Sequence, residues 1–170
     1  MSIIVCPLSF VETVCETRRP SHLLTLLDPG HVIPTPKALG AGAHLKIGVH
    51  DICDETEGLI RPDETVVEQV VAFGRGWTGE APIVVHCWAG ISRSTASAFT
   101  LACERNPEAD ERAIAEEIRR RSVHATPNRR IVALADDLLG RRGRMVDAID
   151  RIGRGEVAHE SRPFEISADW

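Results

Sequence analysis

A short apolar run that leads through a glycine-containing turn into a helical segment constrains this chain most. Residues 82–87, with the sequence PIVVHC, have the length and the β-branched content of a strand that is covered on both faces. The turn that follows contains Gly90, and no helix breaker follows Arg93 until Pro107. A buried strand joined by a tight turn to a helix is a building unit of layered α/β proteins. The sequence therefore predicts an α/β fold.

Apolar runs and helical patterns alternate along the chain. We expect strands at residues 3–6, 22–29, 44–52 and 82–87. We expect helices at residues 9–17, 62–74, 93–105, 109–122, 128–140 and 144–153. Ser9 is the expected N-cap of the first helix, and Pro62 lies in the expected first turn of the second. This order predicts a central, mostly parallel sheet of about four to five strands, flanked by helices and followed by a C-terminal helical block.

Length and composition predict one globular domain. The chain has 170 residues, of which 43% are hydrophobic and 26% are charged, and this balance suffices for one buried core. We divide the single domain 1–170 into a core at residues 1–155 and a C-terminal arm at residues 156–170. The apolar residues Phe164, Ile166 and Trp170 indicate that the arm packs against the rest of the protein.

Charge and cysteine content disfavour several classes of partner. The chain carries 25 acidic and 20 basic residues, so its net charge of −5 gives no reason to expect nucleic acid as a partner. No apolar run reaches the roughly 20 residues that a membrane span needs, and the N-terminus does not resemble a secretory signal. The 5 cysteines are irregularly spaced without a CxxC pair, which predicts no disulfide framework and no metal site. We therefore expect a cytoplasmic protein without a cofactor.

The segment that carries chemistry is residues 86–94, with the sequence HCWAGISRS. In a tight turn between a strand and a helix, successive backbone N–H groups can converge and bind an anion at the positive end of the helix dipole. Arg93 lies six positions after Cys87, so its guanidinium can close the loop and bind two oxygens of a phosphate. These groups favour the thiolate form of Cys87, which is a strong nucleophile. Ser94 can donate a hydrogen bond to that sulfur.

This string resembles the signature of the cysteine-dependent protein tyrosine phosphatases, HCxxGxxR[ST], and it matches every fixed position. The length of the chain and the order of its elements are similar to those of the dual-specificity phosphatases, a group in which we include the small bacterial-type tyrosine phosphatases. This resemblance covers residues 1–155. The resemblance implies a phosphomonoester hydrolase in which Cys87 attacks phosphorus and water then hydrolyses the phosphocysteine intermediate. We expect His86 to order the loop. The residues expected to bind the phosphate are Trp88, Ala89, Gly90, Ile91, Ser92 and Arg93.

Such a reaction needs a general acid to protonate the leaving oxygen. In the resembled family this acid is an aspartate after the preceding strand, and two candidates exist here. Asp51 lies 36 positions before Cys87, where the segment IGVH ends, and Asp54 lies 33 positions before it. We favour Asp51 for its place at the strand end, although Asp54 fits the spacing slightly better. The segment 122–128, SVHATPN, resembles the family's lead into its last core helices and implies that Asn128 supports the phosphate loop.

The residue types around the loop limit the substrates. The chain contains only two lysines, Lys37 and Lys46, both outside the loop, which disfavours a polyphosphorylated lipid. It contains no tyrosine for the recognition loop of the larger tyrosine-specific enzymes. We expect a phosphorylated protein or a small phosphomonoester as substrate, with tyrosine-only and dual specificity both open. Trp88 is either a rim residue that stacks on the substrate or a core contact beneath the loop.

Other functions use similar residues. Sulfur transfer and arsenate reduction also employ a cysteine in an anion-binding loop, but the related enzymes place the arginine differently or carry the loop near the N-terminus. A module that binds phosphate or a phosphoprotein without hydrolysis is disfavoured by the presence of both Cys87 and Arg93. Cys53, two residues past Asp51, is a candidate thiol to form a disulfide with an oxidised Cys87.

Overall fold

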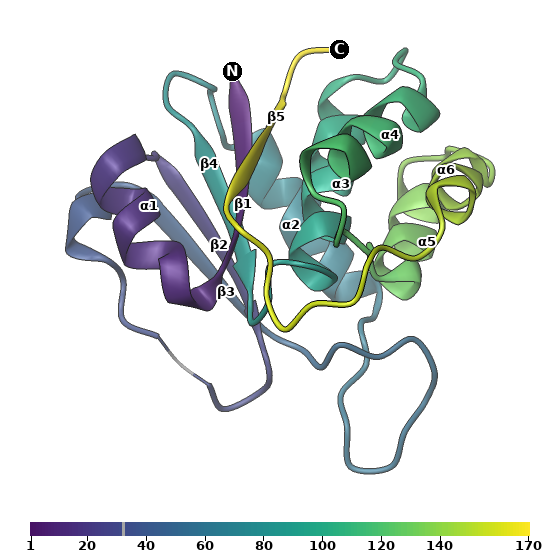
Figure 1. Cartoon of the computed structure of the whole chain (residues 1–170), viewed down its shortest axis with the longest axis horizontal. Coiled ribbons are helices and arrows are strands. Elements are labelled where there is room, and N and C mark those ends of the chain that lie inside the picture. Colours follow the sequence, from purple (N-terminus) through teal and green to yellow (C-terminus); the bar gives the residue numbers. More distant parts are fainter. Residues whose placement is uncertain (32) are drawn as a thin grey trace.

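A five-stranded sheet forms the centre of the molecule (Figure 1). The computed structural model describes residues 1–31 and 33–170. The strands lie in the order β3-β2-β4-β1-β5. Their bounds are β1 Ser2–Pro7, β2 His22–Leu27, β3 Ala43–Gly48, β4 Ile83–Cys87 and β5 Phe164–Ser167. Strands β1 to β4 are parallel to one another and β5 is antiparallel to β1, so the predicted mostly parallel α/β sheet is confirmed.

Helices cover both faces of the sheet unequally (Figure 1). One face carries α1, Val11–Arg18, over a small apolar cluster. The opposite face carries α2 Glu64–Arg75, α3 Arg93–Arg105, α4 Glu111–Arg121, α5 Arg129–Leu138 and α6 Arg144–Ile152. Two short 3₁₀ helices, at Leu8–Phe10 and Lys37–Leu39, precede α1 and β3. The predicted C-terminal helical block is therefore present.

Strand β4 is buried along its whole length. Ile83, Val85 and Cys87 belong to the large core that includes residues of α2 and α3, whereas Val84 belongs to the cluster beneath α1. Alternate residues of the strand thus face two apolar layers, which is why its sequence is apolar without alternation. Its carboxyl end places residues 87–93 at the edge of the sheet where open α/β proteins bind their ligands.

Two helices begin differently from the sequence prediction. Ser9 does not cap α1, because a 3₁₀ turn runs directly into the helix at Val11. The Ser9 hydroxyl instead donates to Glu160 at 2.8 Å. Pro62 stands before the N-cap of α2 rather than inside the helix. The N-cap is Asp63, whose carboxylate accepts a hydrogen bond from a backbone N–H of the first turn at 3.1 Å.

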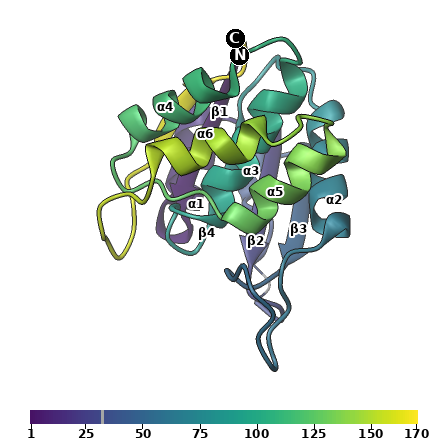
Figure 2. The same cartoon turned by 90° about the vertical axis from the view of Figure 1, so that its right-hand side faces the viewer.

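A long loop joins β3 to α2 and projects from the body of the molecule (Figure 2). It begins earlier than predicted, because β3 ends at Gly48 and not at residue 52. Asp51 therefore lies in the loop near its start. Leu59 and Ile60, further along this loop, are 41% and 56% exposed.

The C-terminal arm is part of the sheet and not only an extended tail. Residues 164–167 form β5, which pairs with β1 so that Ile166 lies opposite Ile3. Phe164 and Ile166 are buried, as the sequence indicates, and they extend the core that lies beneath α4. Trp170, the third residue of this expectation, is 41% exposed. The four-residue strand is too short to be recognised from its own pattern.

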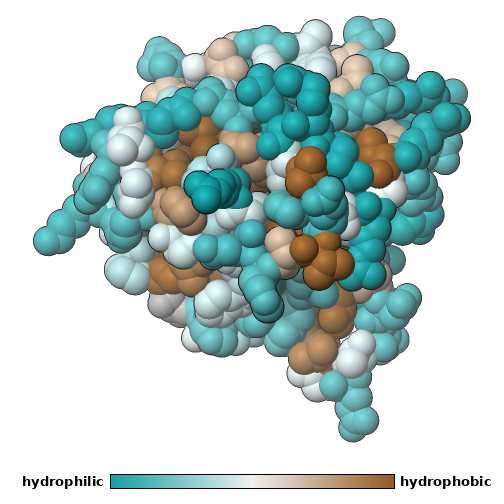
Figure 3. Space-filling model, in the orientation of Figure 1, coloured by the Kyte–Doolittle hydropathy of each residue, from teal (hydrophilic) through white to brown (hydrophobic). Residues whose placement is uncertain are grey.

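The surface seen in Figure 3 is mostly polar, with apolar residues in separate small groups. Within residues 1–31 and 33–170, no helix is both long enough and apolar enough to cross a bilayer. All 5 cysteines are free thiols.

Candidate active site

Residues 88–92 form a loop whose backbone is held from outside. The carbonyl oxygen of each of these residues accepts a hydrogen bond from a donor outside the loop. The donors are the N–H groups of Leu8, Ser161, Thr126 and Asn128 and the hydroxyl of Ser161, at distances of 2.8 to 3.3 Å. In a trans peptide the N–H points away from the preceding carbonyl, so the N–H groups of residues 89–93 face the opposite side. Consecutive N–H groups on one side of a turn at the N-terminus of a helix such as α3 are an arrangement that can bind an anion, and we call this side of the loop the nest.

Cys87 lies at the start of this loop and is 2% exposed. Its Sγ is 3.1 Å from the Oγ of Ser94, a fully buried residue in the first turn of α3. The strand end and the helix start therefore bring together the two atoms that the sequence analysis paired. A hydroxyl that donates to a thiolate stabilises its negative charge.

Arg93 has one edge of its guanidinium bound and another edge free. Its Nη1 donates to the carboxylate of Asp28 at 2.7 Å and to the carbonyl oxygen of Val49 at 2.6 Å. Its Nε is buried and has no hydrogen-bond partner among the described residues. A buried N–H without an acceptor costs free energy. An anion in the nest would supply the missing acceptor.

Asp28, directly after β2, is a site residue that the sequence analysis did not identify. One of its oxygens accepts from Arg93, and the other accepts from the indole Nε1 of Trp88 at 3.1 Å. Burial by itself raises the pKa of Asp28, but the hydrogen bond and charge of Arg93, together with the indole bond, hold that pKa below its ordinary value. The ionised carboxylate thus joins both ends of the loop. In the sequence, the following Pro29 and Gly30 make Asp28 resemble an ordinary turn residue.

The position of Trp88 distinguishes between the two interpretations of this residue. Its side chain is 39% exposed, and its ring packs edge-on against His31 with centroids 4.9 Å apart. Trp88 therefore lies at the rim of the loop and not in the core beneath it.

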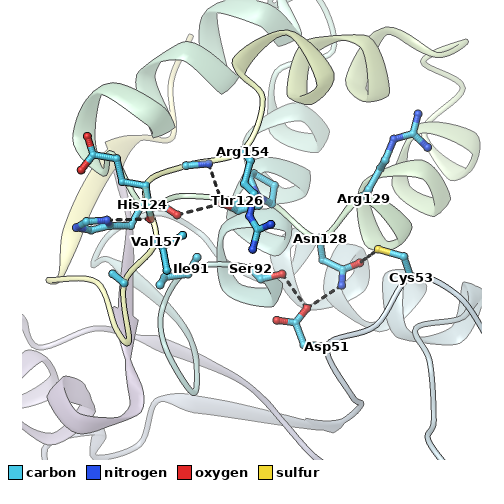
Figure 4. A pocket seen from close by; sticks show the side chains of 14 residues that line it. Asp51, Cys53, Ile91, Ser92, His124, Thr126, Asn128, Arg129, Arg154 and Val157 are labelled. Atoms are coloured by element: carbon cyan, nitrogen blue, oxygen red, sulfur yellow. Dashed lines mark hydrogen bonds between the residues drawn. The ribbon is translucent and has the colours of Figure 1, made fainter. Parts of the chain in front are cut away.

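Of the two candidate acids, the structure brings Asp51 to the loop. Its Oδ1 accepts hydrogen bonds from the hydroxyl of Ser92 at 2.7 Å and from Nδ2 of Asn128 at 2.8 Å (Figure 4). Asn128 is itself held as the N-cap of α5, where its Oδ1 accepts two N–H groups of the first turn. In the part of the chain that the structure describes, the Asp54 carboxylate makes no such contact with the loop.

His86 is buried beneath the loop. Its Nε2 is 2.6 Å from the hydroxyl of Thr25, and the same hydroxyl is 2.8 Å from Nε2 of His44. Burial lowers the pKa of both imidazoles to about 4, so both rings are neutral at pH 7. A threonine hydroxyl can donate only once, so at least one of the rings carries its proton on Nε2. This arrangement favours an ordering role for His86 over proton transfer.

A cavity of about 390 Å³ opens beside the loop (Figure 4). Ile91 and Ser92 line it together with Asp51, Cys53 and residues 154–158 of the C-terminal segment. The cavity is therefore continuous with the rim of the loop.

Cys53 is exposed, and its Sγ lies 3.9 Å from Oδ1 of Asn128. Cys87 is buried below the loop, so a disulfide between Cys53 and Cys87 stays a prediction. Within the described residues, no cluster of three or more histidine, cysteine, aspartate or glutamate side chains could hold a metal ion.

Neither a family model nor a curated protein matches the chain. Solved structures do match. DUSP15 aligns with a TM-score of 0.59 and 17% identity, over 88% of this chain and 89% of that chain. PTPMT1 in complex with PI(5)P aligns with a TM-score of 0.61 and 14% identity, over 82% and 90%. A human tyrosine phosphatase-like serine/threonine/tyrosine-interacting protein aligns with a TM-score of 0.57 and 17% identity, over 81% and 87%. At these identities the likeness concerns the fold.

Proposed function

We propose that this chain, whose fold is that of the dual-specificity phosphatases, is a cysteine-dependent phosphomonoester hydrolase of the protein tyrosine phosphatase type. The observation that carries the proposal is the loop 88–92, in which every carbonyl is bound from outside. The N–H groups left on the concave side and the free Nε of Arg93 suit the oxygens of a phosphate. The Cys87 sulfur at the start of the same loop is the nucleophile.

The proposed reaction consists of two displacements. The Cys87 thiolate attacks phosphorus, an S–P bond forms, and the P–O bond to the substrate breaks as Asp51 gives its proton to the leaving oxygen. Water then attacks the phosphocysteine, Asp51 takes a proton from that water, and the S–P bond breaks to release phosphate. Ser94 donates to the departing sulfur. The N–H groups and Arg93 bind the phosphoryl oxygens as their charge shifts in both transition states.

We propose a phosphorylated protein or a small phosphomonoester as the substrate, whose remainder rests in the cavity beside the loop. Of the two arginines that line this cavity, Arg129 is paired with Asp150 at 2.9 Å. Arg154 forms no ion pair with the described residues and is exposed. Arg154 is therefore the cation available to an acidic group near the phosphate.

The free cysteines suit the reducing cytoplasm, which we propose as the compartment.

A steady-state assay with p-nitrophenyl phosphate tests the proposal. Cys87→Ser should abolish hydrolysis, because a serine hydroxyl is almost entirely protonated near neutrality, yet it should still bind tungstate. Turnover by this variant within about tenfold of wild type would exclude the covalent mechanism. Tungstate binding by a wild-type protein without turnover would favour the phosphate-binding module. Activity toward thiosulfate or arsenate alone would favour the other cysteine enzymes.

A further inference from the structure

The C-terminal arm touches the phosphate loop through Ser161. The N–H of Ser161 donates to the carbonyl oxygen of Ala89 at 2.8 Å, and its hydroxyl donates to that of Gly90 at 3.1 Å. Ser161 is only 2% exposed, so water does not compete for either bond. A single residue, 71 positions beyond Gly90, thus holds two consecutive carbonyls of the loop.

The contact at Gly90 is tight on both sides. Gly90 has φ +68°, and a Cβ built there would lie 2.6 Å from Oγ of Ser161 and 2.7 Å from the backbone N of Pro7. The loop is therefore enclosed between the end of β1 and the arm. A backbone enclosed in this way has little room to rotate while both walls are present.

The arm is anchored on both sides of Ser161. Before it, the N–H of Glu156 donates to the carbonyl oxygen of Val123 at 2.9 Å. After it, β5 pairs with β1, and Figure 1 shows the segment between α6 and β5 crossing the carboxyl end of β4. Ser161 is thus held in place by elements at both ends of the arm, and it can transmit that rigidity to the loop.

We propose that Ser161 is a positioning residue of the active site, and this inference rests on the proposed function. The carbonyl of Ala89 shares a peptide plane with the N–H of Gly90, and the carbonyl of Gly90 shares one with the N–H of Ile91. Holding the two carbonyls outward therefore aims these two N–H groups at the phosphate. Without the Ser161 hydroxyl, the plane between Gly90 and Ile91 is free to turn and its N–H no longer points at the anion.

The test compares Ser161→Ala with Ser161→Cys, which keeps a weaker donor, and with the matched control Ser167→Ala. Ser167 is exposed on the same arm, and among residues 1–31 and 33–170 its hydroxyl bonds only to Asp169. Three quantities are measured besides thermal stability: the affinity for inorganic phosphate, the rate of Cys87 alkylation by iodoacetate at pH 6, and kcat/KM for p-nitrophenyl phosphate.

Ser161→Ala should weaken phosphate binding and slow alkylation about tenfold each, since one buried hydrogen bond is lost. Ser161→Cys should lie between alanine and wild type, and Ser167→Ala should match wild type.

Phosphate binding and alkylation need no turnover, so the inference and the proposed function can fail separately. If Ser161→Ala binds phosphate as wild type does, Ser161 does not position the loop, whatever the activity. If the losses in Ser161→Ala and Ser161→Cys merely follow their unfolded fractions, the role is structural and the inference is wrong. If phosphate binding falls in the order Ser, Cys, Ala while wild type hydrolyses no phosphomonoester, the positioning role holds and the proposed enzyme function is wrong.

Discussion

At the scale of single residues, Arg93 has hydrogen-bond partners on one edge of its guanidinium and a donor without a partner, among the described residues, on another. Asp28 and Val49 hold Nη1, while the buried Nε keeps no partner among the described residues. A planar guanidinium can bind a supporting group and still offer a donor to a ligand because its donors point in fixed, different directions. The direction of the free edge therefore depends on the groups that hold the other edge.

Replacement of Asp28 by asparagine should separate binding from turnover. Asp28→Asn keeps an acceptor for Arg93 but removes the negative charge beside it, so phosphate should inhibit the variant at lower concentration. The guanidinium is held less firmly by a neutral acceptor, so kcat should fall about tenfold. Steady-state kinetics with phosphate as inhibitor measure both effects. If phosphate affinity and kcat both rise or both fall in Asp28→Asn, this account of Asp28 is wrong.

The acid assignment predicts an effect that depends on the leaving group. Asp51→Asn should slow hydrolysis of phenyl phosphate more than that of a highly activated aryl phosphate, because a weakly basic leaving oxygen needs a proton less.

Asp54→Asn is the control for this experiment, with the same charge change in the same loop. A leaving-group effect in Asp54→Asn, with none in Asp51→Asn, would reverse the assignment. If neither variant shows it, the acid is another residue.

The motif identified residues that are neighbours in the chain, and the resemblance added Asp51 and Asn128, which meet across the fold. Asp28 and Ser161 were missed. Cys87, Arg93 and Ser94 are close in sequence, so one motif reveals them. Asp28 contacts Arg93 from 65 positions away, and Ser161 contacts Gly90 from 71 positions away. Such contacts depend on which strands are neighbours, and this order is not encoded in any local pattern.

At the scale of elements, the loop 88–92 is enclosed by the end of β1 and the C-terminal arm. The four predicted strands correspond to β1 to β4, although β3 ends at Gly48 and not at residue 52. By contrast, β5 has only Phe164 and Ile166 as buried residues, and it becomes a strand by pairing with β1. The sequence therefore indicated that the arm packs but did not show that it completes the sheet.

Gly90→Ala tests this enclosure. The added Cβ would lie 2.7 Å from the backbone N of Pro7, in a conformation with φ +68° that alanine rarely adopts. Backbone atoms cannot move aside as a flexible side chain can, so the loop must shift. We expect kcat/KM for p-nitrophenyl phosphate to fall at least a hundredfold, since small displacements of positioned groups have effects of about that size. Gly58→Ala, at another positive φ with open space around it, is the control. Equal activity of the two variants would contradict the enclosure.

At the scale of the whole molecule, buried imidazoles make stability depend on pH. The pKa of His86 is lowered from 6.5 to about 4 in the folded protein, chiefly by burial. Between these values the unfolded chain binds more protons, so the free energy of unfolding should decrease as the pH falls from about 6.5 toward 4. The contribution of His86 to this loss is about 2 kcal/mol at pH 5.

Urea denaturation at pH 7.5 and pH 5 measures this dependence. His86→Gln should lose less stability between the two pH values than wild type does, even if it is less stable at both. His159→Gln, at an exposed position, should behave as wild type. An unchanged difference in His86→Gln would show that other groups cause the acid sensitivity.

The bond between Trp88 and Asp28 gives the protein an optical signal of its own. The emission of an indole responds to the polarity and charge near its ring, and here the indole Nε1 donates to the carboxylate that also binds Arg93. If an anion binds in the nest, as proposed, it should change the electric field at this carboxylate and therefore the emission of Trp88. Trp77 is buried and Trp170 lies on the C-terminal arm beyond β5, so their emission forms a constant background. Binding of an anion in the loop can therefore be measured by the intrinsic fluorescence of Trp88, without a label and before any P–O bond is broken.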